Sequence, residues 1–343
     1  MRRRTRIKLD GVDAYYHLMS RTVNGEKWFG WREKERLRKL IWQVADFSGI
    51  RVLTYAVMDN HFHVLAEVPA ERSVTDAELV RRYRALYPKP TPWQPVSAEV
   101  LADLLRENGR EGKSLRRKLL RRMHDVSWFM KTIKQRFAQI LNFEKHRFGP
   151  VWAERFKSVL VEGDRFALRT VAAYVDLNAV RAGKVEDPKD YRFCGYAEAV
   201  AGNKSARGGL AVIDKTLAGY RQTLFGAGAS PREERSSIDP ADAKRVLEEE
   251  KGRLGLATLL RCKVRYLTDG YVFGSPDFVR DAAEPLKARR AKPVRPRRTP
   301  WSALRGLCVF PGMHGAKGGP GEDPSPGGGE VNPADQSSSH RVF

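Results

Sequence analysis

Cysteine is scarce in this sequence. Its 343 residues include three cysteines, Cys194, Cys262 and Cys308, and no two of them form a C-x-x-C pair. Such spacing argues against a zinc ribbon and against a disulfide framework. The sequence also lacks an apolar run of the ~18 residues that a membrane span needs, and no apolar block follows its basic start. We therefore expect a cytoplasmic protein that does not enter a membrane.

Acidic residues are the second shortage. Lys and Arg number 63 and Asp and Glu number 41, which gives a formal net charge of +22. An excess of this size predicts a polyanionic partner, and nucleic acid is the commonest one. An anionic membrane surface is the alternative, but the lack of an apolar segment argues against it.

The first 200 residues alternate between strand-like and helix-like segments. Runs rich in β-branched and aromatic residues predict strands, and apolar residues at helical spacing predict helices. The predicted strands are residues 13–23, 50–58, 61–68 and 156–162, and the predicted helices are residues 31–49, 126–141 and 164–183. The turn-prone pair Asp59-Asn60 joins two of the strands as a hairpin. This order favours an α+β fold, an antiparallel sheet with helices packed on it.

Three segments lie outside this pattern. Residues 72–125 combine four prolines with a strongly basic stretch, and we expect them to form an insertion. Residues 201–284 are expected to form a helical C-terminal extension, and residues 285–343 are first basic and then rich in Gly, Pro and Ser, a composition typical of disorder. The chemistry is therefore expected within residues 1–200.

The triplet His61-Phe62-His63 is the first candidate site. Side chains alternate along a strand, so both imidazoles point to one face. Neutral imidazole is a common ligand of divalent metals, and added oxygen ligands shift the preference toward Mg or Mn. The alternative is a partly exposed strand with two incidental histidines, because short motifs often occur by chance.

The predicted helix that begins at Asp164 carries the second candidate. At about 100° per residue, Tyr174, Asn178 and Arg181 share one face beside an apolar stripe. A phenol can attack phosphorus, a carboxamide oxygen can bind a metal, and a guanidinium can hold a phosphate. The alternative is that Tyr174 borders the core with its hydroxyl in water.

Four segments in fixed order resemble a known family. They are YHLMSRTVNGE (16–26), YAVMDNHFHVLAEVP (55–69), HRFGPVWAERFKSVLVE (146–162) and YVDLNAVRAGKVEDPKDYRFCGY (174–196). They resemble the REP-associated tyrosine transposases, a branch of the single-tyrosine HUH, IS200-like transposases. The resemblance covers roughly residues 10–200 apart from the insertion. It implies a ferredoxin-like fold, and it implies single-stranded DNA hairpins formed by palindromic repeats as targets.

The resemblance also implies roles for individual residues. His61 and His63 match the two histidine ligands of a divalent metal, Tyr174 matches the nucleophile, and Asn178 matches a third ligand on the helix. The family usually has proline after the asparagine, whereas this chain has Ala179. Alanine continues a helix more readily, so we expect a straighter helix end.

The reaction that the resemblance implies is a transesterification at phosphorus. Tyr174 attacks a phosphate of single-stranded DNA, a 5′-phosphotyrosine forms, and a 3′-hydroxyl leaves. A later 3′-hydroxyl can reverse the step without ATP, and the sequence indeed lacks a G-x-x-x-x-G-K-[ST] phosphate loop. Glu67, on the histidine face of its strand, is one candidate for the base that accepts the tyrosine proton.

Basic side chains interleaved with aromatic ones are expected to hold the DNA. They are Arg155 and Lys157 in the segment RFK (155–157), Arg192 in the segment YRF (191–193), and Arg181 on the helix. The cations would contact phosphates and the neighbouring rings would stack on bases. The same rings fit equally well into a core between sheet and helices.

Two other functions stay open at this point. A non-catalytic relative would bind DNA or RNA and keep the fold and the basicity without turnover. A metal-dependent phosphodiesterase would use water, and Tyr174 would then be structural. We expect a monomer or a homodimer. Only the tyrosine mechanism leaves the protein covalently attached to a DNA 5′ end.

Overall fold

A four-stranded antiparallel sheet forms the centre of the fold in the computed structural model, which describes residues 6–9, 11–70, 73–91, 94–225, 266–287, 297–298 and 307–311. The elements follow the order β1 (Ala14–Arg21), α1 (Trp31–Ser48), β2 (Arg51–Val57), β3 (His61–Val68), α5 (Val126–Glu144) and β4 (Lys157–Val161). The strands lie in the order β2-β3-β1-β4, and each neighbouring pair is antiparallel. The predicted ferredoxin-like arrangement is confirmed.

Local sequence signals explain where these elements begin and end. Gly49 closes α1 with a φ of 66°, a left-handed conformation that glycine adopts without strain. Asp125 caps α5 by accepting hydrogen bonds from the backbone N–H groups of Ser127 and Trp128. Asp164 caps helix α6 (Arg165–Asp176) in the same way, as its position in the sequence predicts.

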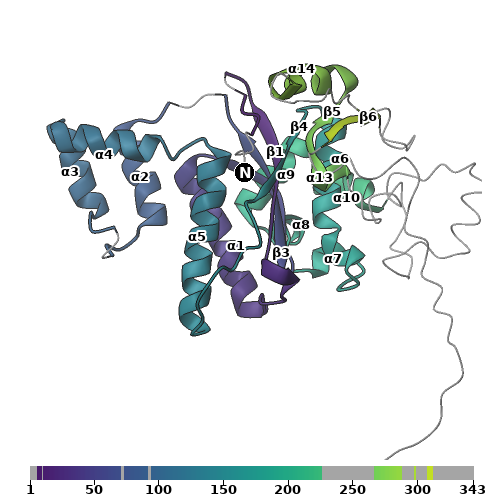
Figure 1. The fold of residues 1–343 in the computed structure, drawn as a ribbon, viewed down its shortest axis with the longest axis horizontal. Coiled ribbons are helices and arrows are strands. Elements are labelled where there is room, and N and C mark those ends of the chain that lie inside the picture. The colour runs from purple at the N-terminus through teal and green to yellow at the C-terminus, as the bar shows by residue number, and fades with distance from the viewer. Residues whose placement is uncertain are drawn as a thin grey trace, which may run out of the picture. The chain divides into compact units, whose positions relative to one another are not determined.

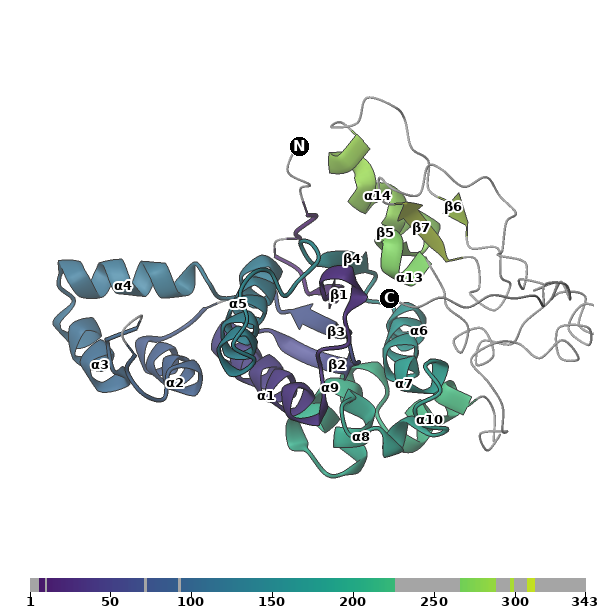
Figure 2. The same ribbon diagram turned by 60° about the horizontal axis from the view of Figure 1, so that its bottom comes forward.

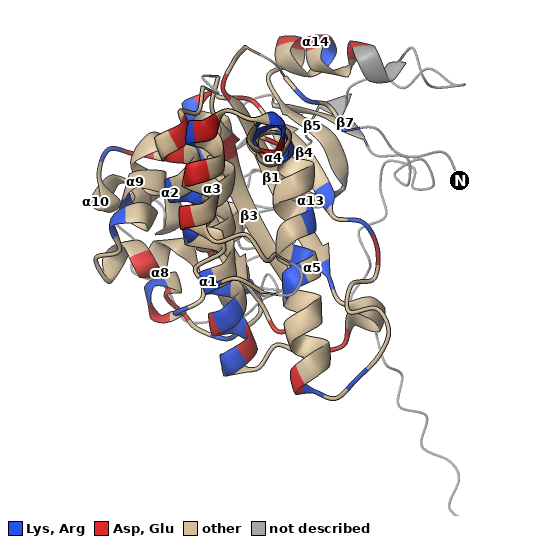
Figure 3. Ribbon diagram, turned by 90° about the vertical axis from the view of Figure 1, so that its left-hand side faces the viewer, with Lys and Arg blue, Asp and Glu red and all other residues tan. Residues whose placement is uncertain are grey.

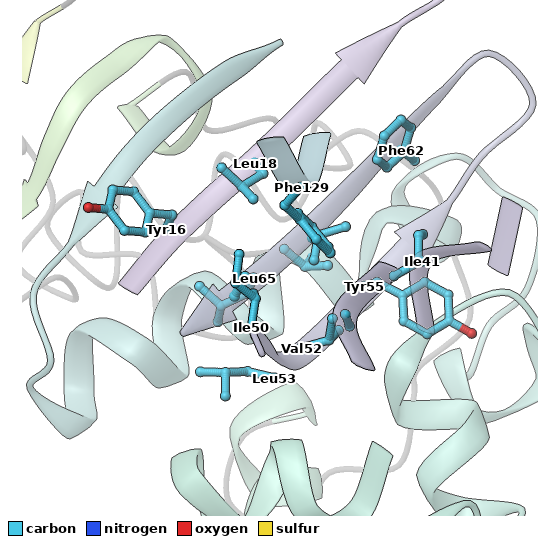
Figure 4. Close-up of a cluster of buried hydrophobic side chains, with 14 of the residues drawn as sticks. Tyr16, Leu18, Ile41, Ile50, Val52, Leu53, Tyr55, Phe62, Leu65 and Phe129 are labelled. Carbon is cyan, nitrogen blue, oxygen red and sulfur yellow. The ribbon is translucent and has the colours of Figure 1, made fainter. Parts of the chain in front are cut away.

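Helices cover both faces of the sheet (Figure 1, Figure 2). On one face α1 and α5 lie side by side, and fully buried side chains gather beneath them (Figure 4). They include Leu18, Tyr55 and Phe62 from the strands and Ile41 and Phe129 from the helices. The other face is covered by α6, α8 (Gly195–Val200), α9 (Lys204–Ile213) and α10 (Leu217–Phe225), with the short α7 (Asn178–Arg181) following α6.

The insertion forms three helices outside the sheet. These are α2 (Asp76–Leu86), α3 (Ala98–Glu107) and α4 (Arg110–Leu120), and they project from the end of the sheet at which β3 finishes (Figure 1). Two short 3-10 helices, η1 (Val23–Gly25) and η2 (Pro188–Asp190), lie in the connections.

The C-terminal extension contributes strands as well as helices, which differs from the expectation of a helical unit. After α13 (Tyr266–Asp269), strand β5 (Gly270–Gly274) pairs in parallel with β4, and α14 (Pro276–Lys287) follows. Strands β7 (Cys308–Pro311) and β6 (Arg297–Arg298) complete a seven-stranded sheet, although they fall in the segment expected to be disordered. Short aromatic and β-branched runs pair where a sheet edge is available. The rest of residues 288–343 lies outside the described residues.

Among the described helices, none has the length and apolar character that crossing a membrane requires.

We predict opposite effects for two adjacent glycines of α9. A Cβ on Gly209 would collide with the Val52 carbonyl oxygen of β2, whereas a Cβ on Gly208 would meet nothing within 4 Å. Gly209→Ala should therefore destabilise the protein by about 1–3 kcal/mol through overpacking. Gly208→Ala should stabilise it by about 0.5–1 kcal/mol, because alanine loses less backbone entropy in a helix. Urea unfolding of both variants tests this, and equal shifts would contradict close packing of α9 on β2.

Candidate active site

The pairing of β1 with β3 places basic side chains beside the two histidines. His61 lies opposite Arg21 and His63 lies opposite Met19, and Met19 in turn lies opposite Lys157 of β4. Paired residues of neighbouring strands point to the same face. One face of the sheet therefore carries both histidines with Arg21 and Lys157, as the alternation within the triplet predicts. Arg21 was not among the predicted site residues.

A third histidine, which the sequence analysis missed, supports His63 from β1. His17 is fully buried and His63 is 5% exposed. The Nε2 of His17 lies 2.9 Å from Nδ1 of His63, and Nδ1 of His17 lies 2.7 Å from the carbonyl oxygen of Leu267. Since a carbonyl only accepts, Nδ1 of His17 carries a proton, and its Nε2 accepts from Nδ1 of His63. The Nε2 of His63 is then the nitrogen with the available lone pair.

His61 is oriented by a separate contact. Its Nδ1 lies 2.7 Å from the carboxamide oxygen of Asn60, whose amide nitrogen donates to the carbonyl of Gly25 at 2.7 Å. Nδ1 of His61 is therefore the donor, and Nε2 is the acceptor nitrogen. Hydrogen bonds of this kind at the far nitrogen orient imidazole rings that bind metals.

Burial keeps the inner histidines neutral. It lowers the pKa of His17 to about 4. It also lowers the pKa of His63 well below its ordinary value, and unfavourable electrostatic interactions of a protonated His63 with His17, His61 and Arg181 act in the same direction. Neutral imidazole is the form that binds metal ions.

Tyr174 lies directly over these histidines. It projects from α6, and its ring centroid is 6.0 Å from that of His17 and 6.2 Å from that of His63. The Arg181 guanidinium carbon lies 4.0 Å from the Tyr174 ring centroid. Only 3% of the Tyr174 surface is exposed. Tyr174 and His63, predicted separately from sequence, therefore come together in the structure.

Asn178 and Arg181 converge on the same turn, as their helical spacing predicts. The Asn178 amide donates to the carbonyls of Tyr174 and Val175 at 3.2 and 3.0 Å, and Arg181 donates to the Tyr174 carbonyl at 2.7 Å. The helix is interrupted at Leu177, between α6 and α7. The expectation of one continuous helix was therefore wrong, although Ala179 stands in place of proline. Backbone hydrogen bonds still cross the interruption, from Leu177 to Ala173 and from Arg181 to Leu177, each 2.9 Å long.

A buried carboxylate fixes the end of α6. Asp176 is fully buried and accepts hydrogen bonds from the hydroxyls of Thr54 and Tyr220 at 2.7 and 2.6 Å, and from the Tyr196 backbone N–H at 3.1 Å. Burial raises its pKa to about 6, although these bonds oppose the shift. Asp176 thereby ties the segment that carries Tyr174 to β2, α8 and α10. Nothing in the local sequence distinguishes it from a surface aspartate.

The donor set suits a divalent metal. Among the described residues, no group of three or more His, Cys, Asp and Glu side chains could hold a metal ion. The site offers instead two imidazole nitrogens oriented from behind, and the Asn178 carboxamide lies one helical turn after Tyr174. The Asn178 amide hydrogens are engaged, so its oxygen is the atom left for a metal. Imidazole nitrogen suits ions such as Zn, Fe and Ni, and carbonyl oxygen suits Mg and Mn, so this mixed set of donors is compatible with a divalent ion.

The remaining predicted DNA-contact residues lie in different settings. Arg155 and Lys157 are exposed. Arg192 is also exposed, but its Nε lies 3.3 Å from a carboxylate oxygen of Glu35. Arg181 is half-buried against Tyr174. Arg155, Lys157 and Arg192 therefore lie at the surface, and Arg181 lies against Tyr174.

The aromatic residues between these cations do not form a stacking surface. Phe156, Tyr191 and Phe193 are all less than a tenth exposed, so they belong to the core. Exposed rings lie elsewhere, on Phe148 at 95% and Trp31 at 60%. Phe148 precedes a segment that pairs with residues 21–23, just beyond the His61 end of the sheet. Sequence alone could not separate buried from exposed rings in irregular segments.

Glu67 is not positioned as a base for Tyr174. It lies four residues beyond His63 on β3, about 13 Å along the strand. One of its carboxylate oxygens is 2.9 Å from the Arg51 guanidinium, and burial raises its pKa. The described part of the chain thus pairs Glu67 with Arg51 at the far end of the sheet.

The part of the chain that carries the histidines matches a family model. Residues 11–85 match the model described as "Transposase IS200 like". This part of the chain is therefore similar to the IS200-like transposases. The matched segment contains His17, Arg21, His61 and His63 and ends before the helix that carries Tyr174. The resemblance noted in the sequence is confirmed, and the family supports a transposase role on DNA.

One solved structure similar to this chain is described as "Structure of the REP associates tyrosine transposase bound to a REP hairpin". It is 15% identical in sequence, with a TM-score of 0.37, and the match covers 59% of this chain and 87% of that chain. No curated protein matches the chain. The roles of individual residues therefore depend on the geometry described above.

We predict the tautomers of the two buried histidines. Both His17 and His63 should carry their proton on Nδ1, because each Nδ1 faces an acceptor. Long-range proton–nitrogen NMR of labelled imidazoles in the wild-type protein measures this directly. His17→Phe should release His63 into a mixture of tautomers and cost about 1–3 kcal/mol for each buried group left unpaired. A wild-type His63 protonated on Nε2 would contradict the assignment.

Proposed function

We propose that this chain is a metal-dependent transposase that cuts and rejoins single-stranded DNA at hairpins through a covalent bond to Tyr174. The observation that carries the proposal is the position of Tyr174 over His17 and His63 of its own sheet, at ring distances of 6.0 and 6.2 Å. The family match of residues 11–85 supports DNA as the substrate.

Tyr174 would supply the nucleophile. Its phenol oxygen forms a bond to phosphorus while the bond from phosphorus to the 3′ oxygen breaks. The products are a 5′-phosphotyrosine and a 3′-hydroxyl, which takes up a proton. The Arg181 guanidinium lies over the ring, so positive charge faces the phenolate that attack requires. The reverse attack by another 3′-hydroxyl rejoins DNA and restores Tyr174.

His61, His63 and Asn178 would hold the divalent metal, Mg or Mn, through the two Nε2 atoms and the carboxamide oxygen. Such an ion polarises a phosphate oxygen and offsets the negative charge of the transition state. The contribution of the protein is orientation: the Asn60 carboxamide fixes one imidazole and His17 fixes the other.

Cations around the histidines would hold the DNA on either side of the cleaved phosphate. Arg21 lies opposite His61. Lys157 of β4 and His63 of β3 lie on either side of Met19 of β1. Arg155 and Arg192 are further exposed cations that would add phosphate contacts, although Arg192 lies beside Glu35 of α1. Phosphate contacts of this kind fix the register of the DNA without reading its sequence. Phe148 and Trp31 offer exposed rings on which unpaired bases would stack.

The low exposure of Tyr174 favours one rival, a phosphodiesterase that uses water and leaves this residue structural. At 3% exposure, the hydroxyl meets a phosphate only if the side chain or the segment α6–α7 shifts when DNA binds. The two mechanisms differ in their products, because hydrolysis leaves no protein attached to DNA.

We predict that Tyr174→Phe abolishes the covalent adduct. The wild-type protein, a hairpin labelled on its 3′ side and Mn or Mg should give a protein–DNA band on a denaturing gel. Chelation with EDTA should remove that band. Tyr15→Phe is the matched control, because Tyr15 lies on the same face of the sheet at its far end, opposite Glu67. Cleavage without an adduct, or an adduct that survives Tyr174→Phe, would overturn the assignment of the nucleophile.

We predict that Tyr174 acts in its own chain. The structure places Tyr174 over the histidines of the same chain. A mixture of Tyr174→Phe protein with His61→Ala protein should therefore form no adduct. If a homodimer exchanged its tyrosine helices, mixed dimers would contain one intact site, and the mixture would recover a substantial fraction of wild-type activity. Size-exclusion chromatography of the mixture establishes whether dimers form.

A further inference from the structure

Helix α4 of the insertion, together with the C-cap residue Arg121, carries a row of cations that the candidate active site does not use. Arg110, Lys113, Arg117 and Arg121 recur at intervals of three and four residues, and all four are exposed. At about 100° and 1.5 Å per residue they lie in one stripe roughly 16 Å long. The opposite side packs on α3, where a Cβ on Gly112 would collide with the Leu104 carbonyl. We call these four residues the basic stripe; Figure 3 shows blue segments on α4, which is seen almost end-on.

The charge of the basic stripe is not balanced within the described part of the chain. Other insertion cations form ion pairs, such as Arg84 with Glu99 and Arg106 with Asp103. No ion pair joins a member of the stripe to a described carboxylate. Like charges four residues apart on a helix repel each other, so the stripe carries a cost that a bound polyanion would relieve.

A hollow continues the stripe toward the sheet. It has a volume of about 830 Å³ and lies between the insertion and the ends of β1 and β3. Its lining combines polar residues with apolar ones: Lys8, Ser73, Thr75, Arg116, Arg121, His124 and Asp125 lie beside Leu9, Tyr16, Val68, Val74, Leu120, Met123 and Val126. Lys8 is paired with Asp125, and Arg116 is paired with Asp76, so these two cations are partly neutralised. Arg121 belongs to both features and joins them into one surface.

The position of this surface indicates what it would bind. The histidines lie at the start of β3, and the insertion leaves the sheet after the end of β3. Eight residues of strand separate the two places by roughly 23 Å. At 3.4 Å per base pair, this corresponds to about seven base pairs of duplex. A stiff duplex spans such a distance without the ordering cost that a flexible single strand pays.

We propose that the basic stripe and the adjoining hollow bind the phosphate backbone of the duplex stem of a DNA hairpin whose single-stranded foot reaches the histidines. This inference rests on the proposed function, since it needs DNA as the substrate. It adds a second contact surface on the insertion, far from the reacting phosphate. Backbone contacts there would raise affinity for stems of sufficient length without specifying their sequence.

The test measures binding in a Tyr174→Phe background, so that it does not depend on cleavage. The probes are two fluorescent hairpins with the same single-stranded foot and stems of about four and about twelve base pairs. Lys113→Gln with Arg117→Gln removes two cations from the basic stripe. Arg84→Gln with Arg106→Gln removes two ion-paired cations from the same insertion and serves as the matched control. Glutamine keeps helix propensity in both variants.

We expect the stripe variant to bind the long stem roughly tenfold more weakly than the parent protein. The slope of log binding constant against log salt concentration should become shallower by about two. Its affinity for the short stem should change less than twofold, as should both affinities of the control. Equal losses in the two variants, or equal losses for the two stems, would overturn the proposal. The proposal would also be overturned if the Tyr174→Phe protein bound anionic vesicles more tightly than the long stem. Adduct formation on a stemless strand, measured with Tyr174 intact, tests the proposed function separately.

Discussion

The candidate site depends on the hydrogen bond between His17 and His63. It joins β1 to β3, and through the Leu267 carbonyl it also joins the sheet to the C-terminal extension. All three groups are at most 5% exposed, so water cannot replace a lost partner. A buried chain of this kind is stable only when every donor meets an acceptor, because each unpaired group costs about 1–3 kcal/mol. The extension is therefore part of what orients the His63 imidazole.

Helix α6, which carries Tyr174, is likewise held by buried hydrogen bonds. Tyr174 and Asp176 are two residues apart on α6 and point in different directions. Tyr174 faces the histidines, whereas Asp176 gathers hydrogen bonds from Thr54, Tyr196 and Tyr220. The Asp176 contacts fix the helix along β2, and the close packing of Gly209 on Val52 positions the neighbouring helix α9. Buried polar bonds thus fix both the histidines and the helix that carries Tyr174.

Local patterns predicted those features that depend on nearby residues. Alternation along β3 put His61 and His63 on one face, and helical spacing grouped Tyr174 with Asn178 and Arg181. His17 escaped notice because its partners are His63 and Leu267, which are 46 and 250 residues away. Similarly, Phe156, Tyr191 and Phe193 were open to two interpretations, since no periodicity separates buried from exposed rings in a loop. The added strand β5 depends on an exposed edge of β4, which only the folded sheet provides.

The covered and open parts of the histidine face determine how DNA could approach. His17 is covered by α6 and by the C-terminal extension. His61 is partly exposed to solvent, and its cross-strand neighbour Arg21 is exposed. Among the described residues, the open side of the site is therefore the one nearest the start of β3. The insertion leaves the sheet after the opposite end of that strand. On the proposed arrangement, affinity for a long substrate and chemistry at its foot would belong to separate parts of the chain, and substitutions would alter one without the other.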